Sequence, residues 1–152
     1  NILCEETNER PEWQLHPDTM TILSYACRKA TCRFKGRDYT AWYTMDVPVS
    51  EGPWKLHGLP GLIIKAEDSR GHFAFTCTGL EQHREAQPIL IHTKGREKLN
   101  RKELDKMYER FYGDPIGFLA ATSPNVTINI TDGQGNPIQK YSVPYNPIEI
   151  NK

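Results

Sequence analysis

The feature that most constrains the fold of this sequence is a hydrophobic period of two residues rather than 3.6. Between residues 39 and 49, one parity is apolar and the other is mostly polar. The apolar positions are Tyr39, Ala41, Tyr43, Met45, Val47 and Val49, and the alternate positions are Thr40, Trp42, Thr44 and Asp46. Because successive side chains of a strand point to opposite faces of its sheet, the pattern predicts an antiparallel strand with one buried face. Trp42 is then expected on the polar face.

Two hairpins are predicted around this strand. The run from residue 19 to 34 should pair with it, because Gly36 can adopt the positive φ that a tight connecting turn requires. Residues 62–67 should pair with residues 73–78 through a polar turn. In that second hairpin the core face is expected to carry Leu62, Ile64, Ala66, Phe73, Phe75 and Cys77.

The two ends of the chain and its last third predict further β structure. A short strand is expected at residues 89–92, and a last hairpin over residues 125–143 with its turn at 132–136. The tail from Pro144 should form an edge strand or a strap, because proline cannot donate to a strand ladder. Residues 1–6 resemble the end of a strand, so an N-terminal portion of the full-length protein is expected to precede them.

One segment has the period of a helix instead. Asn100 and Glu103 have the spacing of a capping box, and Gly113 with Pro115 should end the helix. Apolar side chains recur at helical spacing at Leu104, Met107, Tyr108, Phe111 and Tyr112. We therefore expect one amphipathic helix near residues 101–112.

These elements predict a mainly β, α+β protein: an antiparallel twisted sheet or half-barrel with one helix. The length of 152 residues is typical of a single domain, here residues 1–152. The 19 basic and 19 acidic side chains balance, so no field of one sign attracts nucleic acid. No apolar run approaches the roughly 20 residues of a transmembrane helix. Neither nucleic acid nor a membrane span is expected.

The four cysteines, Cys4, Cys27, Cys32 and Cys77, are an even number, which is typical of two disulfides in an exported protein. Cys27 and Cys32 should not bond each other. On one strand they would lie about 16 Å apart, beyond the roughly 7 Å between bridged Cα atoms. Shared faces favour the pairs Cys32–Cys77 and Cys4–Cys27 among the alternatives.

No residue set has the pattern of an active site. The five histidines are scattered without metal-ligand spacing, and no nucleophile elbow or catalytic cysteine with a plausible base is present. We therefore expect no catalytic residue, no metal and no cofactor.

Five blocks between Trp13 and Gly79 resemble, in order, the GLPGLI family of secreted proteins. They are 12–15, 22–30, 36–43, 47–50 and 52–63. The last contains the signature Gly58, Leu59, Pro60, Gly61, Leu62 and Ile63. One departure is Ser24, where glycine is more usual. The family is typical of Bacteroidetes and has no established activity, so the resemblance implies an extracytoplasmic protein that is periplasmic, associated with the outer membrane, or secreted.

The signature ends a connection from Pro48 to Pro60. Prolines stiffen this connection, and glycines permit close approach of its backbone. One interpretation is architectural, with Trp54 and Leu59 packed under the loop as its own small core and Leu62 pointing inward. The other is a recognition surface formed by Arg37, Trp42 and Trp54, since aromatic and guanidinium groups suit binding.

Three functions are compatible with these features. The preferred one is a non-enzymatic binding or accessory module of the bacterial envelope, which engages a protein, for example an outer-membrane transporter, or a peptide or an apolar ligand. The alternatives are a hydrolase whose site assembles only in three dimensions and a mainly structural envelope component.

Overall fold

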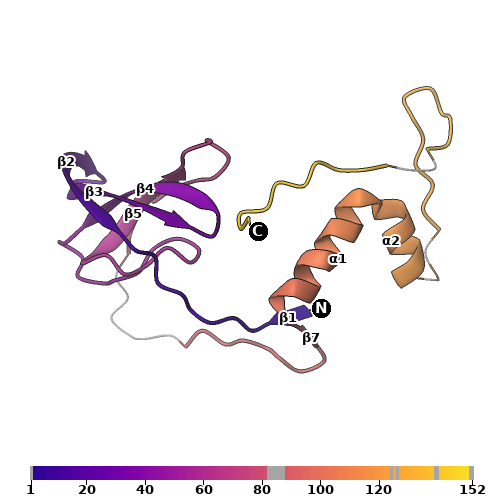
Figure 1. Cartoon of the computed structure of the whole chain (residues 1–152), viewed down its shortest axis with the longest axis horizontal. Helices are drawn as coiled ribbons and strands as arrows, with labels where there is room; N and C mark the ends of the chain where they lie inside the picture. Colours follow the sequence, from indigo (N-terminus) through magenta and orange to yellow (C-terminus); the bar gives the residue numbers. More distant parts are fainter. Residues whose placement is uncertain (1, 82–87, 124, 126, 139–140, 151–152) are drawn as a thin grey trace. The chain divides into compact units, whose positions relative to one another are not determined.

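The computed structural model describes residues 2–81, 88–123, 125, 127–138 and 141–150. The chain divides into two compact units (Figure 1). The sheet unit consists of Asn8–Ile89 and Pro147–Lys152, and the helical unit consists of Asn1–Thr7 and Leu90–Asn146.

The sheet unit contains a five-stranded antiparallel sheet in which sequence neighbours are spatial neighbours. Its order is β2-β3-β4-β5-β6, so β2 and β6 are the two edges. The strands are β2 (Gln14–Ile22), β3 (Tyr25–Phe34), β4 (Arg37–Thr44), β5 (Leu62–Asp68) and β6 (Ala74–Thr76). This open antiparallel sheet confirms the predicted α+β class and both predicted hairpins.

The sequence suggested a single strand from residue 19 to 34, but the structure has two strands there. Leu23 and Ser24 have φ values of 51° and 70°, and they turn the chain back so that β2 and β3 form a hairpin of their own. Ser24, where the resembling family more often has glycine, therefore occupies a left-handed position that glycine adopts without strain.

The core lies on one face of this sheet. It gathers Ala30, Cys32, Phe34, Tyr39, Ala41, Tyr43, Leu56, Leu59, Ile63 and Ala66. The predicted inward parity of β4 is thus confirmed as far as Tyr43. Beyond Thr44 the strand ends, and Met45 and Val49 are 48% and 46% exposed rather than buried.

A β-bulge changes which side chains of β5 reach the core. Trp42 is opposite Lys65, but Tyr43 is opposite Ile63, which leaves Ile64 as an extra residue on β5. An extra residue reverses the parity on one side of a bulge. Ile63 is therefore in the core cluster and Leu62 is only half-buried, so the expectation that Leu62 points inward was wrong.

The helical unit combines a short parallel strand pair with two helices. β1 (Ile2–Cys4) pairs with β7 (Glu97–Leu99), and α1 (Arg101–Gly113) is followed by α2 (Pro115–Thr122). The predicted capping box is present, because Asn100 accepts from the Glu103 N–H and the Glu103 carboxylate accepts from the Asn100 N–H.

The second helix was not predicted. Pro115 was taken as the end of α1, whereas it stands in the first turn of α2, where its missing N–H costs nothing. Asp114 caps this helix by accepting from the Gly117 N–H at 3.0 Å. None of the described helices is long and apolar enough to cross a membrane.

Two predicted β elements are not found in the described part of the chain. Residues 89–92 form no strand, and Ile89 is 93% exposed. The hairpin over 125–143 is reduced to one bridge between Thr131 and Pro137 around the expected turn, in which Asp132 accepts from two backbone N–H groups. Residues 126 and 139–140 of that prediction lie outside the described residues.

Candidate binding surfaces of the sheet unit

A hollow of about 550 Å³ opens in the sheet unit beside the signature loop. Its walls come from the segment that leads into β2 and from the loop itself. The lining residues are Arg10, Pro11, Glu12, Trp13, Leu15, Gly58, Leu59 and Pro60. We call it the signature hollow.

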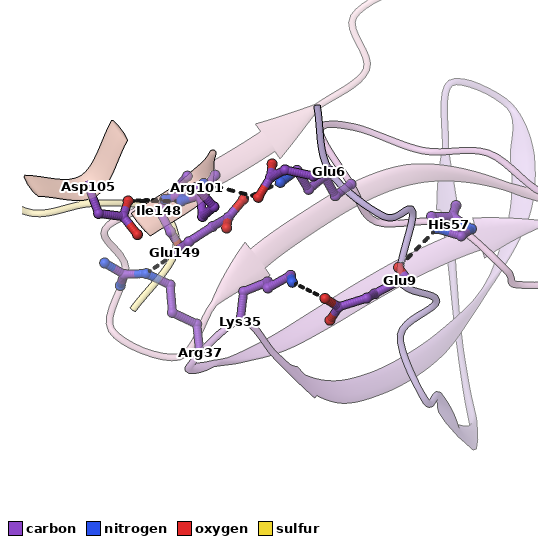
Figure 2. A network of polar contacts seen from close by, with 10 residues as sticks. Glu6, Glu9, Lys35, Arg37, His57, Arg101, Asp105, Ile148 and Glu149 are labelled. Carbon is purple, nitrogen blue, oxygen red and sulfur yellow. Dashed lines mark hydrogen bonds and ion pairs between the residues drawn. The ribbon is translucent and has the colours of Figure 1, made fainter. Parts of the chain in front are cut away.

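The two walls of the hollow are fastened together by three hydrogen bonds. Trp13 Nε1 donates to the His57 carbonyl oxygen at 2.8 Å, and Arg10 Nη2 donates to the Gly58 carbonyl oxygen at 2.6 Å. His57 Nε2 donates in turn to the Glu9 carbonyl oxygen at 3.2 Å (Figure 2). Two of these hydrogen bonds run from the entry segment to the loop, and the third runs from the loop back to the entry segment. The entry segment and the loop are therefore held at a fixed separation.

The side chain of Glu9 adds an ion pair to the same segment. Its Oε1 lies 2.8 Å from Lys35 Nζ. Figure 2 shows the two side chains pointing toward each other. The Lys35 hydrogen bond and charge lower the pKa of Glu9 below its ordinary value. The Glu9 side chain of this ion pair is largely exposed to solvent, so the contact positions the segment more than it stabilises the fold.

Two glycines of the signature are required by close approach. Gly58 has a φ of +94°, and a Cβ on it would lie 2.5 Å from Arg10 Nε. A Cβ on Gly61 would overlap the carbonyl oxygen of Thr44, which is backbone and cannot move aside. The signature therefore sets the shape of the hollow because its two glycines have no Cβ atom and allow these close approaches.

The loop side chains belong to the main core rather than to a separate small core. Leu56 and Leu59 are 0% and 1% exposed within the core cluster. Trp54 packs against that cluster, with its ring centroid 5.9 Å from Phe34 and 6.1 Å from Tyr39. This agrees with the architectural interpretation of Trp54 and Leu59.

Trp42 is half-buried on the sheet face opposite the core. Its cross-strand partners are Lys29 on β3 and Lys65 on β5, so Trp42 lies between two lysine positions of the sheet. Lys29 lies 3.8 Å from Asp18 and Lys65 lies 3.1 Å from Glu67, which leaves this row close to neutral. The predicted polar-face position of Trp42 is confirmed.

Arg37 was expected on the surface, but it is buried and only 2% exposed. Its Nη1 is 2.8 Å from Asp68 Oδ2 and 3.2 Å from His72 Nδ1, and its guanidinium carbon lies 4.6 Å from the centre of the Phe73 ring. A charge read from sequence as a surface group is thus an internal one, paired with a buried aspartate.

The carboxylate of Asp68 is strongly held by its neighbours. Burial alone would raise the pKa of Asp68, but hydrogen bonds from the Phe73 N–H, from Arg37 and from the His72 N–H outweigh it. The pKa therefore stays below its ordinary value, and Asp68 is ionised when the sheet unit is folded.

No disulfide is found among the cysteines of the described part of the chain, so the predicted disulfides are not present in the structure. The favoured pair Cys32–Cys77 is separated by the order of the sheet. Cys32 is on β3 and Cys77 follows β6, with β4 and β5 between them. Three strand spacings amount to about 14 Å, twice the limit for bridged Cα atoms. The exclusion of a Cys27–Cys32 bond agrees with their common strand, β3.

Sequence reasoning singled out one wall of the hollow and missed the other. Arg10, Pro11, Glu12 and Leu15 were given no functional role, although an indole at Trp13 and a leucine at the start of a polar strand were a usable signal. Among the described residues no cluster of histidine, cysteine, aspartate or glutamate is arranged to hold a metal ion.

Comparisons with known proteins give a limited match. Residues 34–65 match a family described as a protein of unknown function (Porph_ging), a stretch that contains Arg37, Trp42, Trp54 and the signature. The match is compatible with the expected family resemblance but does not carry the GLPGLI name. No curated protein matches.

Among solved structures, two described as the structure of PNGF-II, in space groups P21 and C2, are similar at a TM-score of 0.42. Their sequence identities to this chain are 19% and 20%. The similarity covers 67% of this chain, which spans only 19% of the length of those proteins.

Proposed function

We propose that this chain is a non-enzymatic binding module of the bacterial cell envelope, in which the signature hollow holds part of a protein, a peptide or an apolar ligand. The observation that carries the proposal is the hollow itself. Two stiff segments line it, and Leu15 stands on its rim with 57% of its surface exposed.

The lining suits an apolar group presented by a partner. Pro11, Trp13, Leu15 and Pro60 supply apolar surface, while Arg10 and Glu12 supply charges of both signs. Binding sites commonly combine such apolar walls with a few polar groups that set orientation. Because the walls are already fixed by three hydrogen bonds, little conformational entropy is lost when a ligand enters.

The sheet edges are poorer candidates for binding. β2 contains Pro17, and its pairing with β3 shifts register between Leu15 and Thr19, while β6 has only three residues. Proline, bulges and short length each make an edge a bad template for an added strand. Recognition is therefore assigned to side chains of the hollow, with Trp42 as a second contact on the opposite face of the sheet.

The extracytoplasmic location rests on the family resemblance, and an outer-membrane transporter is a partner of the kind proposed. Fractionation of the source bacterium with an antibody against this chain tests the location. Recovery of the protein in the cytoplasmic fraction alone would contradict it.

The binding role is tested with two glutamate substitutions on one strand. Leu15→Glu places a charge in the hollow, whereas Met20→Glu, at a site 39% exposed and outside the hollow, is the matched control. In pull-downs from native envelopes we expect a reproducible partner that Leu15→Glu depletes at least tenfold and Met20→Glu retains. Trp42→Ala should weaken the same partner. An identical partner set for all folded variants would refute the role of the hollow.

A further inference from the structure

Residues 147–150 lie in the sheet unit as a segment that bends at Ile148 and Glu149 and is held at every residue. Arg37 Nη2 donates to the Pro147 carbonyl oxygen at 2.6 Å, and Arg37 Nε donates to the Ile148 carbonyl oxygen at 3.0 Å (Figure 2). Lys55 Nζ is 2.6 Å from Glu149 Oε1, and the Ile150 N–H donates to the Lys35 carbonyl oxygen at 2.8 Å. We call the surface formed by residues 35–37 and Lys55 the tail groove.

The groove is organised by groups that do not belong to the segment. Asp68 and the Phe73 ring fix the guanidinium of Arg37, and the N–H groups of His72 and Phe73 fix Asp68 in turn. A guanidinium held in this way presents its remaining N–H groups to main-chain oxygens in a set direction. Arg37 is therefore positioned to donate to two successive main-chain carbonyl oxygens of a peptide.

Two further features make the groove selective for this segment. Glu149 is 3% exposed and is met by the ammonium of Lys55, so the position favours a carboxylate. A Cβ on Gly36 would overlap the carbonyl oxygen of Ile150, so the groove has room for the main chain only because residue 36 is glycine. Main-chain bonds supply affinity here, and one side-chain charge supplies selectivity.

We propose that the tail groove is a peptide-recognition site for a short segment that carries a glutamate between two aliphatic residues, and that residues 147–150 are its occupant in cis. These residues reach the sheet unit through residues 90–146, which belong to the helical unit. None of the four contacts depends on that connection, so the same segment supplied in trans, as a peptide or by a second copy of the chain, makes the same contacts. The inference is independent of the signature hollow.

The proposal is tested with the full chain and a charge reversal. The probe is a fluorescent peptide of residues 144–152, and the readout is anisotropy. The wild-type chain binds it weakly, because the tethered segment competes at an effective concentration on the order of millimolar. Glu149→Lys places two ammonium groups together and releases that segment, so this variant should bind the peptide at least tenfold more tightly than the wild type. The double variant Lys55→Glu/Glu149→Lys restores an ion pair in cis and should lose this gain.

Two controls complete the test. A peptide with lysine in place of Glu149 should bind neither the wild type nor the Glu149→Lys chain, and Glu149→Gln serves as the variant if Glu149→Lys fails to fold by circular dichroism. A dimer of the wild-type chain that the free peptide dissociates would identify exchange of the tail between copies and support the proposal. Equal peptide binding by the wild type, the folded Glu149 variant and the double variant would overturn it.

Discussion

Asp68 makes the stability of the sheet unit dependent on pH. Its pKa in the folded protein is below the ordinary value of 3.8, so the unfolded chain takes up this proton first as the pH falls. The stabilisation is fully present above pH 3.8 and is lost as the pH falls through the lowered folded pKa. Denaturant unfolding between pH 7 and pH 2.5 should show this loss in the wild type.

Asp68→Asn isolates that contribution. At pH 7 the variant should lose about 3 kcal/mol of unfolding free energy, since it leaves Arg37 buried without its carboxylate. The difference from the wild type should shrink as the pH falls below 3.8, because Asp68 of the unfolded chain then takes up a proton before Asp68 of the folded protein does. A difference that stays constant down to pH 2.5 would show that the ion pair does not stabilise the fold.

Tyr39 is a buried residue whose hydroxyl has no hydrogen-bond partner among the described residues. Burial raises the pKa of Tyr39 to about 12, so the side chain stays neutral. Because an unbonded buried hydroxyl costs free energy, Tyr39→Phe should stabilise the sheet unit by about 1 kcal/mol. Tyr43→Phe, in the same core cluster, is the matched control and should give no gain in denaturant unfolding. A loss for Tyr39→Phe would show that the hydroxyl is bonded in solution.

The cysteines provide a chemical test of the sheet order. Burial raises the pKa of the Cys32 thiol to about 12, and burial likewise raises the pKa of Cys27, so neither forms the reactive thiolate readily. In a preparation free of reductant, Cys4 and Cys77, which are only half-buried, should react with a thiol reagent in the native protein. All four should react after unfolding. Fewer than four would restore the disulfide hypothesis.

At the scale of elements, the signature loop depends on its glycines to different degrees. Gly61→Ala should cost roughly 1–3 kcal/mol, because the new methyl group meets the Thr44 backbone and the chain must shift. Gly58→Ala should cost less, about 1 kcal/mol, because the obstacle is the flexible side chain of Arg10, although the positive φ remains unfavourable. Thermal unfolding should rank the two variants in this order. The reverse order would place the rigid contact at Gly58.

Local patterns explain which elements could be predicted. The parity of β4 and the cap of α1 are written in adjacent residues, so they were visible in the sequence. The bulge at Ile64 was not, because it arises from pairing with β4 and leaves the apolar run of β5 unchanged. The turn at Leu23 and Ser24 was hidden for a related reason, since neither residue type favours the left-handed conformation they adopt.

The candidate sites were predictable only in part, because their halves are distant in sequence. Trp13 and His57 are 44 positions apart, and Arg37 and Ile148 are 111 apart. The family resemblance drew attention to the signature wall, but nothing local announces that residues 10–15 face it. Arg37 was named as a binding residue, a role that stays a prediction, yet its burial becomes visible only once Asp68 is placed beside it.

At the scale of the whole molecule, the two units differ in how much they bury. The sheet unit contains the hydrophobic core, whereas α1 and α2 contain no buried residue. Because local stability follows buried apolar contact, the helical unit should open at lower denaturant concentration. Urea unfolding should therefore show two steps, the first by loss of the helical circular dichroism signal and the second by a change in tryptophan fluorescence. This measurement also tests whether residues 1–152 act as one domain.

Two substitutions assign the steps. Phe111→Ala removes the edge-to-face contact between Phe111 on α1 and Phe118 on α2, whose ring centroids are 5.6 Å apart. It should therefore shift only the first step. Ile63→Ala makes a cavity in the sheet core and should lower the free energy of the second step by about 2–5 kcal/mol while leaving the first in place. If both variants shift one coincident transition, the two units unfold together, and the difference in their burial does not give them separate stabilities.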